Sequence, residues 1–347
     1  MHRTQDIARK LAALQHLGFE RVADPGVATE STRVGRGSHM VTARRPSMGT
    51  LVSVSTLAPS PARAEEAIGR AFEEMDRLVA IFSRYEHDSA ISALNEHGRL
   101  DGSPPELAGV VERSLVYHTL SRGAFDVSIA PVLDLFVASP GGTPTAGEMR
   151  DALEVVGASG VAVDGRRVNF ARPGMRITLD GIAKGFIVDA IADVLRRHKV
   201  HDHLINAGGD IRTSGRKQGR RPWTVAVQHP AKDGSYPDTI HLSDGAVATS
   251  GMYEHYFDRD QLIHHIVDGT TGQSPDECAS VSVTAPTAMA ADALSTTVFV
   301  LGPTAGIPFV EGLPGCECLI IDREGRQRRS RGWKSAGAVT GGEEGEV

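Results

Sequence analysis

The stretch AMAADALSTTVF, residues 288–299, has the apolar composition of a helix that is buried in a core. Within it, Asp292 and Thr296 stand four residues apart and share one helical face. A carboxylate one turn below a hydroxyl in such a helix has two interpretations. Either N–H groups of the first turn satisfy the carboxylate while the hydroxyl bonds back to a carbonyl. Or both oxygens ligate a hard cation such as Mg²⁺.

Length and composition place few limits on function but exclude one class. The chain has 347 residues, of which 40% are hydrophobic and 23% charged, as in an ordinary soluble globular protein. Its net charge of −6 argues against a nucleic-acid-binding protein. A phosphate-bearing ligand stays compatible, because a bound divalent metal would supply positive charge locally. We find no apolar run long enough to span a bilayer and predict no transmembrane segment.

The first forty residues differ from the rest. Ile7, Leu11 and Leu14 predict a short amphipathic helix, and the polar residues 24–47 predict a linker. The segment RGSHM at 36–40 resembles a cloning-site remnant, so the residues before it are either a fused expression element or native. The predicted division of the chain is an N-terminal extension over 1–40, one domain over 41–335 and a disordered tail over 336–347.

From Met48 onward the pattern becomes regular. A strand is expected over 50–57, followed by helices that start near Pro61, over 105–123 and over 184–200. Short strands follow at 203–209, 223–230, 246–251, 264–268, 279–285 and 318–322. Because helices and strands come in blocks, we predict an α+β fold, with mixed or antiparallel sheets packed against helices, and not a doubly wound sheet.

The common catalytic fingerprints are absent from the sequence, and each remaining polar segment is ambiguous. Gly49 in MGT either lets a ligand approach the backbone or merely begins a strand. Tyr85 in FSRY either stacks on an aromatic ligand or packs at a helix end. Asp126 in GAFD is either functional or a buried capping residue.

Two further segments carry charged or titratable groups. In GIAKGFIVD, a glycine-bearing turn precedes a helix, so Lys184 and free N–H groups either meet an anion or face solvent. In HHIVDGTTG, His264 and His265 point to opposite faces of a strand. Periodicity does not decide which imidazole would enter a pocket beside Asp268.

Taken in order, these segments resemble the ApbE family of FAD:protein FMN transferases. The resemblance runs from Met48 to about Gly302 and rests on the ordered set MGT, FSRY, GAFD, GIAKGF(I)VD, AGGDI, TSG, HHIVDGTTG and ADALSTT. Any single piece is unspecific, whereas the ordered set is highly specific. The resemblance implies an ApbE-like (T-fold-like) architecture.

The resemblance also implies roles for individual residues. It implies a Mg²⁺ site made by Asp292, Thr296 and the carbonyl of Gly181, with Ser295 nearby. It selects His265, the residue directly before I-V-D, as the general base. The implied FAD contacts are Met48, Tyr85, Ala124, Phe125, Asp126, Lys184 and, at a substituted position, Thr178.

Three departures from the family pattern stand out. Many relatives read DLGGIAKG, with an Asp at the position that Thr178 occupies here, while this chain has Asp180 two residues later. Relatives commonly have Pro after the H-I-I-D segment, where this chain has Gly269. Many members are exported lipoproteins, and since this sequence shows neither signal peptide nor lipobox, a cytoplasmic form is expected.

The function implied by the resemblance is Mg²⁺-dependent transfer of FMN from FAD to a Thr or Ser hydroxyl, with release of AMP. The acceptor would be a flavoprotein carrying a short flavinylation motif. Two alternatives remain. One is a Mg²⁺-dependent FAD pyrophosphatase that gives FMN and AMP, in which water replaces the hydroxyl. The other is a non-catalytic FAD-binding protein.

Overall fold

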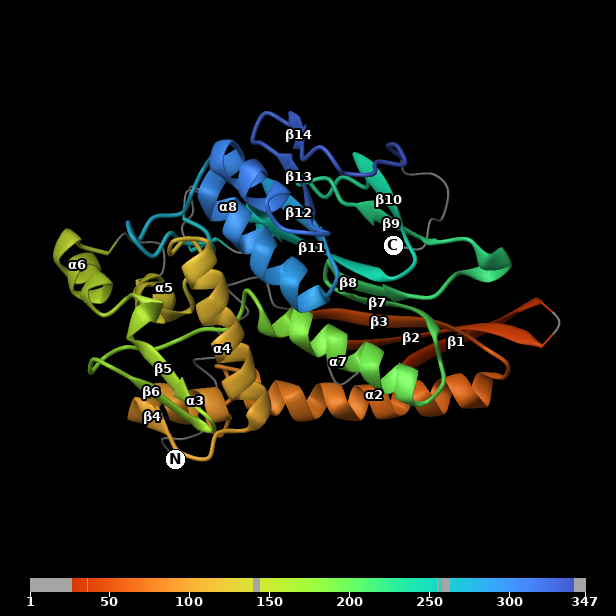
Figure 1. Cartoon of the computed structure of the whole chain (residues 1–347), viewed down its shortest axis with the longest axis horizontal. Coiled ribbons are helices and arrows are strands. Elements are labelled where there is room, and N and C mark those ends of the chain that lie inside the picture. Colours follow the sequence, from red (N-terminus) through yellow and green to blue (C-terminus); the bar gives the residue numbers. More distant parts are fainter. Residues whose placement is uncertain (1–26, 36, 140–143, 255, 258–262, 340–347) are drawn as a thin grey trace.

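The computed structural model describes residues 27–35, 37–139, 144–254, 256–257 and 263–339. Its centre is a nine-stranded antiparallel sheet in the order β1-β2-β3-β7-β8-β11-β12-β13-β14 (Figure 1). The strands are β1 (Ala28–Gly35), β2 (Ser38–Ser47), β3 (Thr50–Ala58), β7 (Asp202–Ala207), β8 (Asp210–Ser214), β11 (Gly245–Gly251), β12 (Ser280–Ala285), β13 (Glu317–Ile321) and β14 (Gln327–Arg329).

Three long helices cover one face of this sheet (Figure 1): α2 (Pro61–Phe82), α7 (Ala183–Arg197) and α8 (Ala288–Glu311). Their apolar sides and the sheet enclose the main core. α2 begins where the sequence predicts, because the Ser60 hydroxyl accepts the N–H of Arg63 and Pro61 fits the first turn. α7 lies between the other two helices and contacts both.

α8 is long and apolar enough to pass for a membrane span by length and composition. However, 56% of its most apolar window is buried inside the fold, as expected of a core helix. Gly302 breaks the helical backbone with φ 68° and ψ 173°, and Pro303 follows directly. The helix therefore bends over the sheet.

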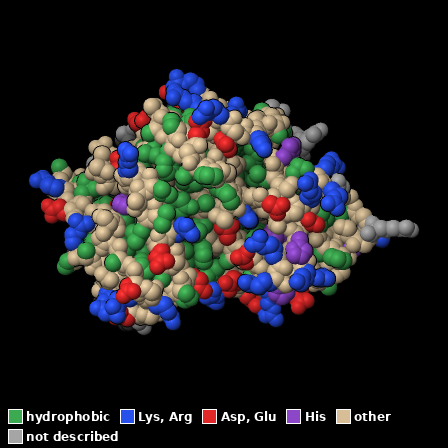
Figure 2. All heavy atoms as spheres, viewed as in Figure 1, with side chains coloured by type: hydrophobic (Ala, Val, Ile, Leu, Met, Phe, Trp, Pro, Cys, Tyr) green, Lys and Arg blue, Asp and Glu red, His purple; other side chains and the backbone are tan. Residues whose placement is uncertain are grey.

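Smaller elements surround this frame. At one end lie α3 (Ala90–His97), α4 (Pro105–Leu120), α5 (Ala130–Ala138), α6 (Ala146–Glu154) and the sheet β4-β6-β5, made of Arg99–Leu100, Arg167–Phe170 and Val161–Asp164. The second face of the large sheet is covered by the hairpin of β9 (Trp223–Val227) and β10 (Asp238–Leu242), together with Trp333. Figure 2 shows hydrophobic side chains gathered over α4 and α8 in the middle of one face.

The α+β prediction with antiparallel sheets is confirmed, but three local expectations are wrong. Residues 28–47 do not form a linker: they make β1 and β2, because alternate side chains such as Val41 and Ala43 bury against α2 while the strands pair with β3. Residues 336–339 are not a disordered tail, since the N–H of Ala336 donates to the carbonyl of Thr239, and Val339 and Tyr236 exchange two backbone hydrogen bonds. The predicted helix over residues 7–14 lies outside the described residues.

The third correction concerns 264–268, where a strand was expected. This segment is irregular apart from one bridge between His264 and Tyr256. Its backbone groups bond within the loop: the N–H of His264 donates to the Ser274 hydroxyl at 2.9 Å, and that of Asp268 donates to the Gln273 carbonyl at 2.9 Å. The residue pattern that predicted a strand over 264–268 is therefore found here in a loop.

Candidate active site

The first turns of α7 and α8 hold each other. The N–H of Gly185 in α7 donates to Oδ2 of Asp292 in α8 at 2.9 Å. In return, Asp189 in α7 accepts the N–H groups of Ala288 and Met289, both at 2.9 Å. Asp189 lies one turn after Gly185 in α7, and Asp292 lies one turn after Ala288 in α8. The first turns of the two helices therefore pack against each other in antiparallel orientation. Both carboxylates thereby satisfy N–H groups that a helix start leaves without partners.

Gly185 is what allows the two helices to come this close. A Cβ atom added there would lie 2.3 Å from the carbonyl oxygen of Ala288 and 2.8 Å from Cβ of Asp292. Real side chains do not tolerate such distances. The glycine in the KG pair is therefore needed for helix contact, and its N–H for the Asp292 carboxylate.

Negative charge is concentrated at this junction. Asp292 is 5% exposed and Asp210, at the start of β8, is 2% exposed. The Lys184 ammonium lies 3.3 Å from Oδ2 of Asp210. Burial raises the pKa of Asp292 well above its ordinary value, and the charge of Asp210 raises it further, while Lys184 and the N–H of Gly185 act in the opposite direction. A buried carboxylate in such surroundings would be stabilised by a cation.

Hydroxyl groups extend the oxygen-rich surface along α8. The Ser250 hydroxyl, at the end of β11, lies 2.8 Å from that of Ser295 and 3.2 Å from that of Thr296. A Cβ atom added at Gly181 would lie 3.1 Å from Oγ1 of Thr296, so that loop touches the same face. Thr297, not Thr296, bonds back to a helix carbonyl, that of Ala293 at 2.7 Å. Asp292 and Thr296 thus meet other elements of the fold.

The donor set suits a hard cation better than a soft one. Asp292, Ser295 and Thr296 offer only oxygen, beside the backbone at Gly181, and oxygen ligands are those that Mg²⁺ prefers. In the described part of the chain, no three His, Cys, Asp or Glu side chains form a metal-binding group. A site with a single carboxylate fits Mg²⁺ that is completed by ligand oxygens, not an all-protein cage.

The GAFD segment supports the same junction from the other side. Phe125 is 3% exposed, and one edge of its ring lies 3.5 Å from a Cβ added at Gly181. Asp126 serves as a cap: its carboxylate accepts from the N–H of Ser128 at 2.8 Å and of Ala158 at 3.1 Å. Asp126 therefore acts as a cap, as one of its two interpretations expects, while its contact with FAD stays a prediction. Ala124 stands next to Phe125 and is half-buried.

Thr178 lies under the same loop. It is 6% exposed, its N–H donates to the carbonyl of Val127 at 2.7 Å, and its hydroxyl accepts from the N–H of Asp180 at 3.2 Å. Arg84 lies 4.0 Å from the Asp180 carboxylate and 2.7 Å from that of Asp134. Thr178 therefore shapes the loop, while Asp180 contacts the FSRY segment.

Two further residues of the predicted FAD-binding set are Tyr85 and Met48. The Tyr85 side chain is 66% exposed, and the guanidinium carbon of Arg84 lies 5.5 Å from its ring centroid. Met48 adopts φ 52°, a backbone conformation that is uncommon for a residue other than glycine. The MGT turn also touches the AGGD turn, because a Cβ added at Gly208 would lie 2.4 Å from the Thr50 hydroxyl. The AGGD turn itself reaches the junction, since Asp210 contacts Lys184.

The two adjacent histidines have different surroundings. His264 is fully buried, its Nε2 lies 3.0 Å from the carbonyl of Pro275, and its Nδ1 accepts the N–H of Ile266 at 3.3 Å. Its ring packs edge-on against Phe299 of α8, at 5.4 Å between centroids. His265 is half-buried, and its ring lies 6.4 Å from that of His264. The loop then reaches Gly269, where an added Cβ would lie 3.4 Å from Cβ of Asp126.

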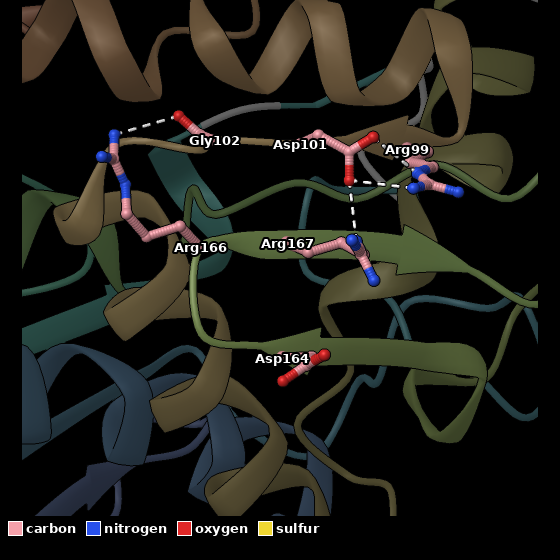
Figure 3. A pocket seen from close by; sticks show the side chains of 6 residues that line it. All are labelled: Arg99, Asp101, Gly102, Asp164, Arg166 and Arg167. Carbon is pink, nitrogen blue, oxygen red and sulfur yellow. Dashed lines mark hydrogen bonds and ion pairs between the residues drawn. The ribbon is translucent and has the colours of Figure 1, made fainter.

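A shallow pocket of about 320 Å³ lies elsewhere, on the three-stranded sheet (Figure 3). Asp101 holds Arg99 at 2.8 Å and Arg167 at 2.7 Å, while Arg166 donates to the carbonyls of Gly102 and Ser103. Asp164 completes the lining. The arginines are thus engaged with their neighbours, and none of the lining residues belongs to the segments described above.

Comparison with known proteins identifies the family. The sequence profile of the ApbE family matches residues 48–320. The chain belongs to the ApbE family. Among relatives of this ApbE protein, the FAD:protein FMN transferase of Treponema pallidum is 32% identical over 311 residues, covering 82% of this chain and 85% of that protein. The FAD:protein FMN transferase of Vibrio cholerae serotype O1 is 30% identical over 280 residues, covering 77% and 83%.

Solved structures agree with the fold of this ApbE protein. The ApbE protein of Thermotoga maritima superposes with a TM-score of 0.75 at 29% identity, covering 88% of this chain and 97% of that one. The flavinyl transferase ApbE of Pseudomonas stutzeri, in its apo form, gives a TM-score of 0.77 at 26% identity, covering 86% and 97%. The predicted ApbE-like architecture is therefore confirmed.

Sequence reasoning missed three residues of this ApbE site: Asp189, Asp210 and Ser250. All three stand inside the quoted segments GIAKGFIVD, AGGDI and TSG. Their partners lie far away along the chain, as with Asp189 and Ala288, which are 99 residues apart. The motifs contain these residues, but the sequence does not show which distant residues they contact. For Gly185, sequence reasoning expected an N–H that faces an anion, and this N–H donates to the Asp292 carboxylate.

Proposed function

We propose that this protein is an FAD:protein FMN transferase, which moves FMN from FAD to a Thr or Ser hydroxyl of an acceptor flavoprotein and releases AMP. The observation that carries the proposal is the buried Asp292 carboxylate, aligned with the Ser295 and Thr296 hydroxyls where α7 meets α8. Membership of the ApbE family and the names of the relatives support it.

Mg²⁺ would be held by Asp292 and Thr296, with Ser295 and the carbonyl of Gly181 close by. Bound there, it would supply positive charge to the diphosphate linkage of FAD as that linkage is cleaved. The finding that favours this choice is an all-oxygen donor set around a carboxylate whose pKa is raised by burial and by Asp210.

The remaining residues bind and orient FAD. Lys184 and the N–H groups at the start of α7 would place fixed positive potential near the phosphates. Tyr85 offers an exposed ring for stacking, and Phe125, beside Gly181, and Met48 are the further proposed FAD contacts. Asp126 would act by capping the loop that carries Ala124 and Phe125, since its carboxylate bonds to backbone groups.

His265 is the proposed general base. The acceptor hydroxyl oxygen would form a bond to the phosphorus of the FMN half, the bond to the AMP phosphate would break, and the hydroxyl proton would pass to the imidazole. The surroundings of His264 favour this choice, because both of its ring nitrogens are engaged with backbone groups. His265, in contrast to the fully buried His264, is a half-buried residue.

The decisive experiment mixes the protein with FAD, Mg²⁺ and a flavoprotein that carries a Thr or Ser flavinylation motif. Mass spectrometry of the acceptor should show a gain equal to FMN less water, together with one AMP per transfer. Unchanged acceptor with free FMN and AMP would instead identify a pyrophosphatase. FAD that is bound but never split would identify a non-catalytic flavin-binding protein.

A matched pair of threonines tests the metal assignment. Thr296→Val removes the hydroxyl that faces Ser250, whereas Thr297→Val removes one that bonds only within its helix. We expect the first variant to need more Mg²⁺ for half-maximal transfer and the second to need the same as wild type. Equal Mg²⁺ requirements in all three proteins would contradict the role of Thr296.

A further inference from the structure

Asp189 closes the GIAKGFIVD segment, yet it lies on the side of α7 that faces the start of α8. Its two carboxylate oxygens are used on consecutive backbone groups, Oδ1 on the N–H of Ala288 and Oδ2 on that of Met289. This arrangement fixes both the position and the rotation of the first turn of α8. A single hydrogen bond would fix only the position.

β8 holds Asp189 in place. Nε of Arg212 lies 3.7 Å from Oδ1 of Asp189, and the same guanidinium donates to the carbonyl of Pro286, just before α8. The Arg212 side chain is 12% exposed and that of Asp189 is 21% exposed, so the pair is shielded from solvent. Arg212 shares a face of β8 with Asp210, two residues earlier, which contacts Lys184. β8 therefore contacts two charged groups of α7, Lys184 through Asp210 and Asp189 through Arg212.

The helical repeat carries this alignment to the metal-binding face. Ala288 and Asp292 are four residues apart, so a rotation of the first turn of α8 also moves the Asp292 carboxylate. The junction offers little slack, because a Cβ added at Gly185 would lie 2.3 Å from the carbonyl oxygen of Ala288. A shift large enough to break the Asp189 bonds would therefore also displace Asp292 from the N–H of Gly185.

We propose that Asp189 is a positioning residue: by capping α8, it holds Asp292, Ser295 and Thr296 in the arrangement that receives Mg²⁺. Its link to Mg²⁺ rests on the proposed function. The geometric coupling from Asp189 to the Gly185–Asp292 hydrogen bond does not, and it is open to a separate measurement.

The test compares Asp189→Asn with Asp193→Asn. Asp193 lies one turn further along α7, its side chain is 52% exposed, and its carboxylate contacts Arg196 on the same helix. Asparagine at 189 keeps one acceptor but turns an amide N–H₂ toward a backbone N–H. We expect Asp189→Asn to raise the Mg²⁺ concentration for half-maximal transfer about 10–100-fold, with kcat largely restored at saturating Mg²⁺. Asp193→Asn should match wild type.

Two measurements without turnover separate positioning from simple loss of stability. In hydrogen exchange, the amide of Gly185 should exchange on the order of tenfold faster in Asp189→Asn than in wild type or Asp193→Asn. In melting experiments with Mg²⁺ alone, the Mg²⁺ concentration that gives half of the full rise in Tm should be higher for Asp189→Asn than for wild type or Asp193→Asn.

The inference is overturned if Asp189→Asn speeds exchange only over residues 288–292 and leaves the Gly185 amide and the Mg²⁺ requirement unchanged. In that case Asp189 would cap α8 and do nothing more. Wild-type protein that transfers no FMN would refute the proposed function, while the exchange at Gly185 would still decide the positioning role.

Discussion

The N–H of Gly185 and the carboxylate of Asp292 form a 2.9 Å hydrogen bond across 107 residues of sequence. This bond joins the KG pair to the ADALST helix, the two segments that would hold phosphate and metal. It also explains the buried Asp292: part of its oxygen surface caps the start of α7, and the opposite side of the junction carries Lys184 and Asp210. The first interpretation of the 288–299 stretch is half right: a backbone N–H satisfies the carboxylate, but it comes from α7, and Thr297 instead of Thr296 bonds back to a carbonyl. The cation site stays a prediction.

Replacing Asp292 with Asn should separate stability from function. Because burial and Asp210 raise the pKa of Asp292, an ionised carboxylate is unfavourable in the metal-free fold, and a neutral amide can still accept the N–H of Gly185. We expect an unchanged or higher Tm without Mg²⁺, no rise in Tm with Mg²⁺, and a loss of transfer of about 10²-fold or more. Full turnover of this variant in chelator would refute the metal assignment.

Gly185→Ala should destabilise the protein by about 1–3 kcal/mol, the usual cost of overpacking, because the new methyl group meets the Ala288 carbonyl. Chemical denaturation measures this directly. The control is Gly109→Ala in α4, where an added Cβ has no neighbour within 4 Å. That exchange should stabilise the protein by roughly 0.5–1 kcal/mol, as alanine does within a helix. Similar behaviour of both variants would contradict the close helix contact.

The adjacent histidines should fail in different ways. His265→Ala should keep FAD binding and lose transfer by ~10²–10⁴-fold, as expected when a general base is removed. His264→Ala should lower stability by about 1–3 kcal/mol, since it leaves the carbonyl of Pro275 and the N–H of Ile266 without their partner. FAD binding by fluorescence, transfer and urea unfolding distinguish the two. A stable, inactive His264→Ala beside an active His265→Ala would reverse the assignment.

His203 should make the fold sensitive to acid. It is fully buried in β7, and burial lowers its pKa to about 4. Since the unfolded chain takes up a proton near pH 6.5, stability from this group is complete above that pH and is lost as the pH falls toward 4. The loss is on the order of 3 kcal/mol.

His203→Asn should flatten this dependence between pH 6.5 and 4, because the amide does not titrate and can still donate to the carbonyl of Val200. The exposed His201 provides the control, and His201→Asn should keep the slope of wild type. The measurement is the urea midpoint as a function of pH. An equal slope in all three proteins would show that other groups govern the acid limb.

The sequence predicts elements whose signals are local. α2 and α7 follow from their apolar periodicity, the start at Pro61 and the basic end at Arg196 and Arg197. The composition of β2 favours a linker because the strand carries two serines, two arginines and a proline, although one of these arginines, Arg45, is held by Asp76 at 2.8 Å. That acceptor lies on α2, which composition alone does not reveal.

The sequence could indicate which segments belong to the candidate site, but not which of their residues contact one another. The resemblance to a family supplied Asp292, Thr296 and Lys184, and the structure joins the segments that carry them. It could not supply the contact of Asp189 with α8 or of Arg212 with Asp189, because each depends on how α7, α8 and β8 pack. Periodicity could not separate His264 from His265, because the 264–268 segment is a loop and not the expected strand.

Mutual capping of α7 and α8 has a consequence for how the protein is made. The contact between Gly185 and Asp292 closes a loop of 107 residues. The entropic cost of closing this loop comes before any gain from the hydrogen bond, so such junctions form late in folding. A ribosome-bound chain that ends before residue 292 contains the residues of α7 but lacks the Asp292 carboxylate that accepts the N–H of Gly185. The catalytic centre therefore cannot exist in a nascent N-terminal fragment, and flavin chemistry begins only when synthesis is nearly complete.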